Sequence, residues 1–193
     1  MVESEKMISL SEPTFLGPEK QRVMECIDSG WVASGPWTQQ FEEDVVRYLQ
    51  SDIYGCSVVS GSAALYLALK IVGVKPGDLV VVPTLTFAAT VNAVVQNGAE
   101  PVFIDCDEHL NLSVEGLQQF LETRCEKRDQ WYLKGKQRIA ALMAVDILGH
   151  PADWVRMKEL VGDTLPIVED AAEAFGSWKK VGDQWQACGT CLL

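Results

Sequence analysis

The chain has 193 residues and a net charge of −11, and hydrophobic residues make up 48% of it. This composition is typical of a folded chain with a sizeable core and excludes an intrinsically disordered protein. The acidic charge argues against nucleic acid or an anionic membrane as a partner. No apolar run approaches the roughly 18 residues of a membrane span. Because the first ten residues also lack the apolar region of a signal peptide, a cytoplasmic location is expected.

Two helices separated by a loop are predicted near the start of the chain. Val23 and Ile27 are four positions apart, a spacing that predicts an amphipathic helix over residues 18–29. A turn-rich loop with two tryptophans follows over residues 31–37, before a second predicted helix over residues 38–50. Large apolar side chains in such a loop favour a protein contact, because a monomer rarely leaves them in water.

From residue 51 onward, predicted strands and helices alternate. Strands are predicted over residues 56–59, 79–82, 101–104, 139–145 and 167–168, and helices over residues 62–72, 86–97, 114–123 and 153–161. This alternation implies parallel βαβ units, and strands that are apolar on both faces imply helices on both sides of the sheet. The sequence therefore predicts a three-layer α/β/α fold with a mostly parallel sheet. A charged stretch over residues 125–138 is predicted to be a solvated surface insertion.

The residues that follow each strand are the candidates for a site, because ligands bind outside the carboxyl ends of parallel strands. Ser60, Gly61, Ser62 and Ala63 follow the first predicted strand and begin a helix. The free N–H groups and the positive dipole end of that helix can hold a phosphate. The same residues also suit an ordinary helix cap, and they lack the glycine spacing of dinucleotide and P-loop sites.

Two further strand ends carry an aromatic ring and a pair of carboxylates. Phe87 can stack on a planar heterocycle or belong to the core. Glu169 and Asp170 are adjacent at the last strand end, where a carboxylate can pair with a protonated ring nitrogen, as pyridoxal phosphate requires. No metal site is expected, because neither of the two histidines, His109 and His150, has ligand spacing to another.

Four motifs of this chain carry a family resemblance. They are S-G-S-A-A-L from Ser60, P-T-L-T-F-A-A-T-V-N-A from Pro83, G-H-P-A-D from Gly149 and E-D-A-A-E-A-F-G from Glu169. In this order and spacing they resemble the DegT/StrS family of nucleotide-sugar aminotransferases. The resemblance implies an aspartate-aminotransferase-like large domain of fold type I that uses pyridoxal 5'-phosphate (PLP). It also implies transfer of an amino group, from glutamate as the amino-acid donor, to a nucleotide-linked keto sugar for cell-surface glycan synthesis.

The resemblance also implies roles for individual residues. The residues that it places around the cofactor are Gly61, Ser62, Ala63, Phe87, Asp170 and Glu173. The first three are implied to bind the phosphate, Phe87 to stack on the pyridine ring and Asp170 to pair with the pyridine nitrogen. Glu173 stands near the cofactor hydroxyl, where many members have glutamine or histidine.

The catalytic lysine of the family is not expected within the chain. In the family this Schiff-base lysine follows a glycine-aspartate or glycine-threonine step, which resembles Gly189-Thr190, so it is expected beyond Leu193. Residues 1–50 are then expected to hold the N-terminal helices and a loop for the dimer and the active site. Residues 51–193 are expected to be an incomplete PLP-binding large domain without the C-terminal small domain. The chain alone is expected to be inactive, and the full-length protein a homodimer.

Two alternative functions stay open at this point. A non-catalytic truncated product or partner subunit fits the missing lysine. A Rossmann-type nucleotide-sugar oxidoreductase fits the alternating pattern, but it predicts a glycine-rich turn after the first strand and a Tyr-x-x-x-Lys pair, and neither is present. Cys188 and Cys191 form a C-x-x-C pattern, for which a redox or metal role is disfavoured because no helix is predicted after it.

Overall fold

Apolar strands form the centre of the molecule in a computed structural model that describes residues 9, 12–135 and 137–190. One sheet contains β1 (Leu79–Pro83), β2 (Glu100–Ile104), β3 (Cys125–Lys127), β4 (Trp131–Leu133), β5 (Arg138–Val145) and β6 (Ile167–Asp170). β1 pairs in parallel with β2 and β5, and the second half of β5 pairs in parallel with β6. The β3–β4 hairpin adds antiparallel strands beside the start of β5, so the sheet is mixed.

Helices precede and separate the strands. They are α1 (Glu19–Asp28), α2 (Pro36–Tyr48), α3 (Gly61–Ile71), α4 (Ala88–Gln96), α5 (Val114–Arg124) and α6 (Trp154–Val161), with 3-10 turns η1 (Ile147–Gly149) and η2 (Gly162–Thr164). A separate antiparallel hairpin follows, made of β7 (Trp178–Val181) and β8 (Gln184–Ala187). Within the described residues, no helix is long and apolar enough to cross a membrane.

The two faces of the sheet are covered by different helices. Every residue of β1 is buried, and successive side chains of a strand point to opposite faces. Val80 and Val82 pack in one cluster with apolar residues of α3 and α4, whereas Leu79 and Val81 pack in a second cluster with residues of α5 and α6. The expected three layers of helices, sheet and helices are therefore present.

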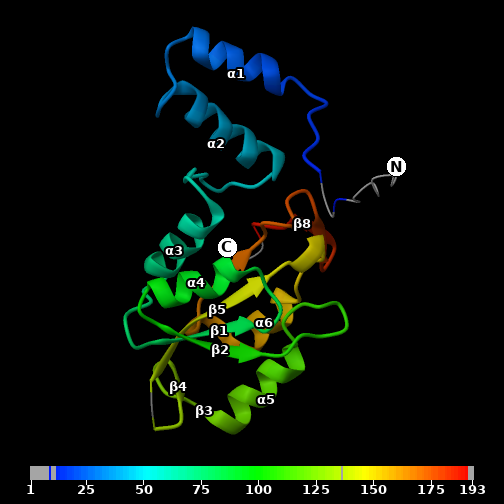
Figure 1. Cartoon of the computed structure of the whole chain (residues 1–193). Coiled ribbons are helices and arrows are strands. Elements are labelled where there is room, and N and C mark those ends of the chain that lie inside the picture. Colours follow the sequence, from blue (N-terminus) through cyan, green and yellow to red (C-terminus); the bar gives the residue numbers. More distant parts are fainter. Residues whose placement is uncertain (1–8, 10–11, 136, 191–193) are drawn as a thin grey trace, which may run out of the picture.

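The first two helices lie apart from the sheet, beyond the N-terminal end of α3 (Figure 1). Neither α1 nor α2 contains a buried residue, and apolar side chains such as Val23, Trp31 and Phe41 are exposed. One contact to the rest of the chain is the stack of Tyr48 on Phe175, whose ring centroids are 5.1 Å apart. This part of the chain therefore presents apolar surface that the described residues leave uncovered.

The strand expected over residues 56–59 is not formed, and that prediction is wrong. These residues pair with no strand of the described chain, and Val59 is 98% exposed. Ser57 is held by α2 instead, because Oε1 of Glu42 accepts hydrogen bonds from its backbone N–H and its hydroxyl, both at 2.7 Å. The two hydrogen bonds to Ser57 lower the pKa of the Glu42 carboxyl. The apolar run predicted a strand, but a strand also needs a neighbour, which local sequence does not reveal.

The stretch over residues 125–138 is also different from its expected form as a solvated insertion. It contains the β3–β4 hairpin, which widens the sheet. Cys125 is buried, and Trp131 and Leu133 pack against the core cluster beneath α5 and α6. Its charged residues are gathered over residues 126–129 and its apolar residues over residues 131–133, so the sequence shows no alternation that would indicate two paired strands.

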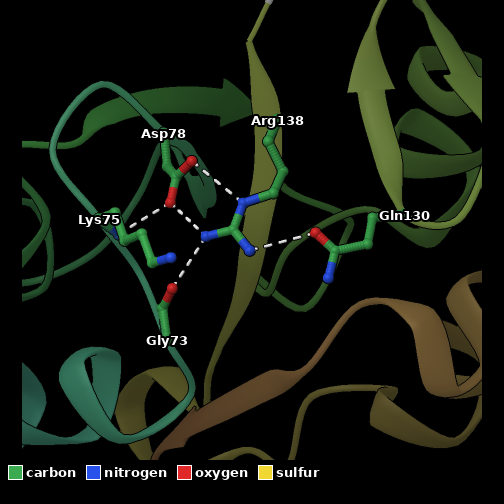
Figure 2. Close-up of polar contacts among 5 residues, drawn as sticks. All are labelled: Gly73, Lys75, Asp78, Gln130 and Arg138. Atoms are coloured by element: carbon green, nitrogen blue, oxygen red, sulfur yellow. Dashed lines mark hydrogen bonds and ion pairs between the residues drawn. The ribbon is translucent and has the colours of Figure 1, made fainter.

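Arg138 fastens this hairpin to the loop before β1 (Figure 2). Its Nε donates to Oδ1 of Asp78 at 3.1 Å, and its Nη2 donates to Oδ2 of the same carboxylate. The guanidinium also donates to the carbonyl oxygen of Gly73 at 2.8 Å and to Oε1 of Gln130 at 3.1 Å. Asp78 Oδ2 accepts a further bond from the backbone N–H of Lys75 at 2.7 Å. The hydrogen bonds with Asp78 raise the pKa of Arg138, so the guanidinium stays charged.

We expect Arg138→Met to lower the free energy of unfolding by about 3 kcal/mol, because it leaves the largely buried Asp78 carboxylate without its charged partner. Urea denaturation followed by circular dichroism measures this loss. Arg128→Met is the matched control, since its ion pair with Glu126 is exposed and the change should stay within about 0.5 kcal/mol. Equal losses in the two variants would contradict the prediction.

Candidate active site

The start of α3 presents backbone donors at one edge of the sheet. Ser60 is the N-cap residue, and its Oγ accepts a hydrogen bond from the N–H of Ala63 at 3.2 Å. The N–H groups of Gly61 and Ser62 belong to the first helical turn and have no carbonyl partner within the helix. Both residues are exposed, and a Cβ at Gly61 would meet no atom within 4 Å. An anion can therefore approach this turn closely, although Ala63 is already bound to the cap.

Phe87 begins α4 and is not a core residue. It is the N-cap of that helix, and it is 76% exposed. Its carbonyl oxygen accepts a hydrogen bond from the backbone N–H of Thr90, one turn further along. The exposed ring leaves a face on which a planar ligand can stack.

Asp170 ends β6, and α4 holds its side chain. Its Oδ2 accepts a hydrogen bond from the hydroxyl of Thr90 at 2.9 Å, and its Oδ1 accepts one from the backbone N–H of Ala172 at 3.3 Å. Thr90 is fully buried, and its own oxygen accepts a bond from the hydroxyl of Thr86 at 2.8 Å. The first turn of α4 therefore links the two groups. Phe87 is its N-cap residue, and Thr90 of the same turn donates the hydrogen bond to the Asp170 carboxylate.

Two of the three predicted parts of the site are joined directly, by the hydrogen bond from Thr90 in the first turn of α4 to Asp170 at the end of β6. Helix α3 packs against both α4 and β6, so the helix that begins with Gly61 and Ser62 belongs to the same part of the fold. Thr90, which sequence reasoning missed, is the residue that makes the link to Asp170. It stands within the motif that begins at Pro83, but its neighbours alone do not show which way its hydroxyl points.

The Glu173 carboxylate is hydrogen-bonded to the backbone of the chain. Its Oε2 accepts a hydrogen bond from the N–H of Leu148 at 2.6 Å. Leu148 has a φ of 52° and Gly149 a φ of 83°, so the η1 turn is left-handed at two successive residues. Side chains with a Cβ rarely adopt this conformation, and the Glu173 carboxylate stabilises it. The sequence led us to expect Glu173 near a cofactor hydroxyl, and its hydrogen bond to the backbone of Leu148 was not expected.

Potential metal ligands gather at a place that the sequence did not indicate. Ligand atoms of Asp146, Glu169 and Cys188 all lie within 4.8 Å of one another. The rings of His109 and His150 also meet, with centroids 4.6 Å apart, although they are 41 positions apart in the sequence. The partner of Cys188 in the C-x-x-C pattern, Cys191, lies outside the described residues.

Comparison with protein families identifies the chain. The model of the DegT/DnrJ/EryC1/StrS aminotransferase family matches residues 16–189. The chain belongs to this family. The resemblance inferred from the four motifs is therefore confirmed.

Members of the family with known names share a substantial part of the sequence. GDP-perosamine synthase of Escherichia coli O157:H7 is 38% identical over 89% of this chain and 44% of its own length. The GDP-perosamine synthase of Vibrio cholerae is 37% identical over 91% of this chain and 46% of its own length. DesV of S. venezuelae, solved in complex with a ketimine intermediate, superposes with a TM-score of 0.71 and 32% identity over 86% of this chain and 44% of that one. The fold expected from the sequence is thus confirmed, and the chain spans less than half the length of these relatives.

We expect Thr90→Val to lower the free energy of unfolding by about 1–2 kcal/mol, because the Asp170 carboxylate loses a buried hydroxyl donor. Valine keeps the branched shape, so the loss reports the hydrogen bond and not the packing. Thr123→Val is the control, since the Thr123 hydroxyl is exposed and bonds only to a carbonyl of its own helix. Chemical denaturation measures both, and an unchanged Thr90→Val variant would show that the bond contributes nothing.

Proposed function

We propose that the whole protein is a PLP-dependent aminotransferase that moves an amino group from glutamate to a nucleotide-linked keto sugar. The observation that carries this proposal is the Asp170 carboxylate, which Thr90 in the first turn of α4 holds at the carboxyl end of β6. Family membership supports amino transfer, and the relatives named GDP-perosamine synthase support a nucleotide-linked sugar as substrate.

The described residues fit the cofactor. The N–H groups of Gly61 and Ser62, with the Ser62 hydroxyl, would hold the phosphate at the positive end of α3. Phe87 would cover one face of the pyridine ring, and Asp170 would hold the proton on the ring nitrogen. When bound there, the protonated ring supplies an electron sink for the substrate carbon.

The chain's own residues would fix this arrangement before any ligand arrives. The hydroxyl of Thr86 donates to that of Thr90, and the hydroxyl of Thr90 donates to Asp170. This chain of hydrogen bonds orients the carboxylate toward α4. Glu173 would act next to this site by holding the η1 turn through Leu148. Two points stay predictions: the position of the Schiff-base lysine beyond Leu193, and the inactivity of residues 1–193 alone.

The exposed apolar surface of the N-terminal helices supports a second element of the proposal, a homodimer. Val23, Trp31, Phe41 and Tyr54 expose more than half of their surface. Large apolar patches of this kind mark protein interfaces in soluble proteins. We therefore propose that α1, α2 and the loop between them contact a second copy of the protein.

We expect Asp170→Ala to weaken PLP binding by at least about tenfold and to abolish most amine transfer in the whole protein. A charge-assisted hydrogen bond contributes about 1.5–3 kcal/mol, and the ring nitrogen loses it in this variant. Titration of PLP against tryptophan fluorescence gives the dissociation constant, and amine transfer from glutamate gives the activity. Asp163→Ala, at an exposed carboxylate, is the control. Wild-type turnover in Asp170→Ala would disprove the pairing with the ring nitrogen.

We also expect the whole protein to elute as a dimer, and Trp31→Glu to shift it toward monomer because a buried charge disrupts an apolar contact. Size-exclusion chromatography with light scattering over a concentration series measures the shift. Trp185→Glu serves as the control, because Trp185 is a similarly exposed tryptophan on β8. A monomer at high concentration with full activity would count against the dimer.

A further inference from the structure

The turn after β5 has a backbone conformation that a leucine does not favour. Leu148, in η1, has a φ of 52° and a ψ of 25°, which lie in the left-handed region that residues with a Cβ rarely adopt. Glycine adopts this region readily because it has no Cβ. The leucine side chain also gains little from burial, since it is 74% exposed. Neither the local conformation nor the core of the described residues therefore accounts for a leucine here.

Two side chains from the segment after β6 hold the turn in this shape. Oε2 of Glu173 accepts a hydrogen bond from the N–H of Leu148 at 2.6 Å. Oγ of Ser177 donates to the carbonyl oxygen of Gly149 at 2.9 Å. A Cβ at position 149 would approach the carbonyl oxygen of Glu173 to 3.2 Å, so the two segments lie against each other at this point.

A third side chain, from the segment between β2 and α5, spans the turn. Asn111 is 2% exposed, and its Oδ1 accepts a hydrogen bond from the N–H of Ile147 at 3.1 Å. Its Nδ2 donates to the carbonyl oxygen of His150, also at 3.1 Å. Four hydrogen bonds from three side chains thus determine the conformation of the turn. Strained backbone persists only where its surroundings determine it in this way, and it is concentrated at active sites and ligand clamps.

The turn stands at the edge of the sheet where the proposed cofactor site lies. β5 ends at Val145, which pairs with Asp170 at the end of β6. The N–H of Asp146 donates to the carbonyl oxygen of Asp170 at 3.0 Å, which continues this pairing to the residue before the turn. Ligands of parallel sheets bind outside the carboxyl ends of the strands. Leu148 is thus an exposed aliphatic side chain at the same strand ends as the carboxylate proposed to hold the ring nitrogen.

An aliphatic side chain in this place suits one of the two proposed substrates. Glutamate carries two carboxylates and an amino group, which need charged or hydrogen-bonding partners, and leucine offers neither. A sugar ring exposes C–H groups on its faces, and these can bury apolar surface against an aliphatic side chain. The sugar is therefore the substrate that gains from a contact with Leu148.

We propose that Leu148 is a specificity-determining residue that contacts the keto sugar. Glu173, Asn111 and Ser177 are positioning residues, which hold the turn that presents the leucine. The sugar contact rests on the proposed function, whereas the strained turn does not. Leucine occupies a position that glycine would fit better, because its side chain serves the substrate and not the fold.

Three variants of the whole protein separate the strain from the contact. Leu148→Gly removes both the strain and the side chain, so its melting temperature should rise by about 1–2 °C. Leu148→Ala keeps a Cβ in the left-handed region and should show no rise. Leu110→Gly is the matched control, because Leu110 has a φ of 69° and follows β2, which does not neighbour β6 in the sheet. Its melting temperature should rise by a similar amount.

A lower melting temperature in Leu148→Gly than in the wild type would overturn the proposal. The leucine would then serve the fold, a contact with a second copy or a contact with another part of the whole protein. Size-exclusion chromatography with light scattering distinguishes the second copy, because a dimer contact through Leu148 would shift the variant toward monomer.

Steady-state kinetics test the sugar contact. A panel of GDP-linked and UDP-linked 4-keto sugars first identifies a sugar to which the wild type transfers the amino group of glutamate. For that sugar, Leu148→Gly and Leu148→Ala should each lower kcat/KM at least about fivefold, because both lose an apolar contact. The kcat/KM for glutamate and the dissociation constant of PLP should stay unchanged, and Leu110→Gly should match the wild type in all three. An unchanged kcat/KM for the sugar in both Leu148 variants would refute the contact.

A double variant tests the positioning role of Glu173. Glu173→Ala removes the acceptor of the Leu148 N–H and should lower kcat/KM for the sugar several-fold, while Glu173→Gln keeps an acceptor oxygen and should recover most of the loss. If Glu173 acts through Leu148, Glu173→Ala should have no further effect on this value in the Leu148→Gly background. The full loss in that background would show that Glu173 acts on the sugar independently and would overturn its positioning role.

Failure of the proposed function has a different signature. A wild type that binds no PLP and transfers no amine to any sugar of the panel would overturn both the function and the sugar contact. The melting temperatures of the two Leu148 variants would still decide whether the turn is strained. A wild type that transfers amine, with Leu148 variants equal to it, would overturn the sugar contact alone.

Discussion

The position of β5 depends on the ion pair of Arg138 with Asp78. β5 is the strand that pairs with β1 on one side and with β4 and β6 on the other. Arg138 is its first residue, and the two-pronged contact with Asp78 ties it to the loop before β1 and, through Gln130, to the hairpin before β5. A guanidinium is suited to this place because its planar donors reach both carboxylate oxygens and a carbonyl group at once. Because β6 pairs with the second half of β5, fixing the start of β5 also fixes the residues of β5 that β6 pairs with.

That register decides where the chemistry can occur. Val145 pairs with Asp170, so the last residue of β6 stands level with the end of β5. The side-chain alternation of a strand then sends Asp170 toward α4 and Glu169 toward the hairpin β7–β8. Helix α4 completes the site from the opposite direction, because Phe87 and Thr90 are three residues apart and lie on the same side of its first turn. The register of β5 and β6 and the first turn of α4 are therefore all needed to hold one carboxylate.

The sequence predicted the layers and the buried strands β1, β2, β5 and β6, because apolar strands and helix periodicity are local signals. Leu79 to Pro83 and Ile139 to Val145 are apolar runs that only a covered sheet can bury. The missing strand at residues 56–59 and the unexpected hairpin at residues 125–138 share one cause, since whether a segment pairs depends on a neighbour elsewhere in the chain. The contacts of Thr90 and of Asp146 were not predictable for the same reason. Each joins residues far apart in the sequence, and neither residue type announces its partner.

The acidic charge of the chain makes local neutralisation a condition of the proposed function. With a net charge of −11, the overall field opposes a phosphate ligand, so the first turn of α3 must attract it locally. Asp170 has to stay negative to hold a proton on a ring nitrogen, and each further charge nearby works against the anionic phosphate. The Thr90 hydroxyl and the backbone N–H of Ala172 both donate to the Asp170 carboxylate, so neutral donors hold this group in place and add no charge beside the phosphate.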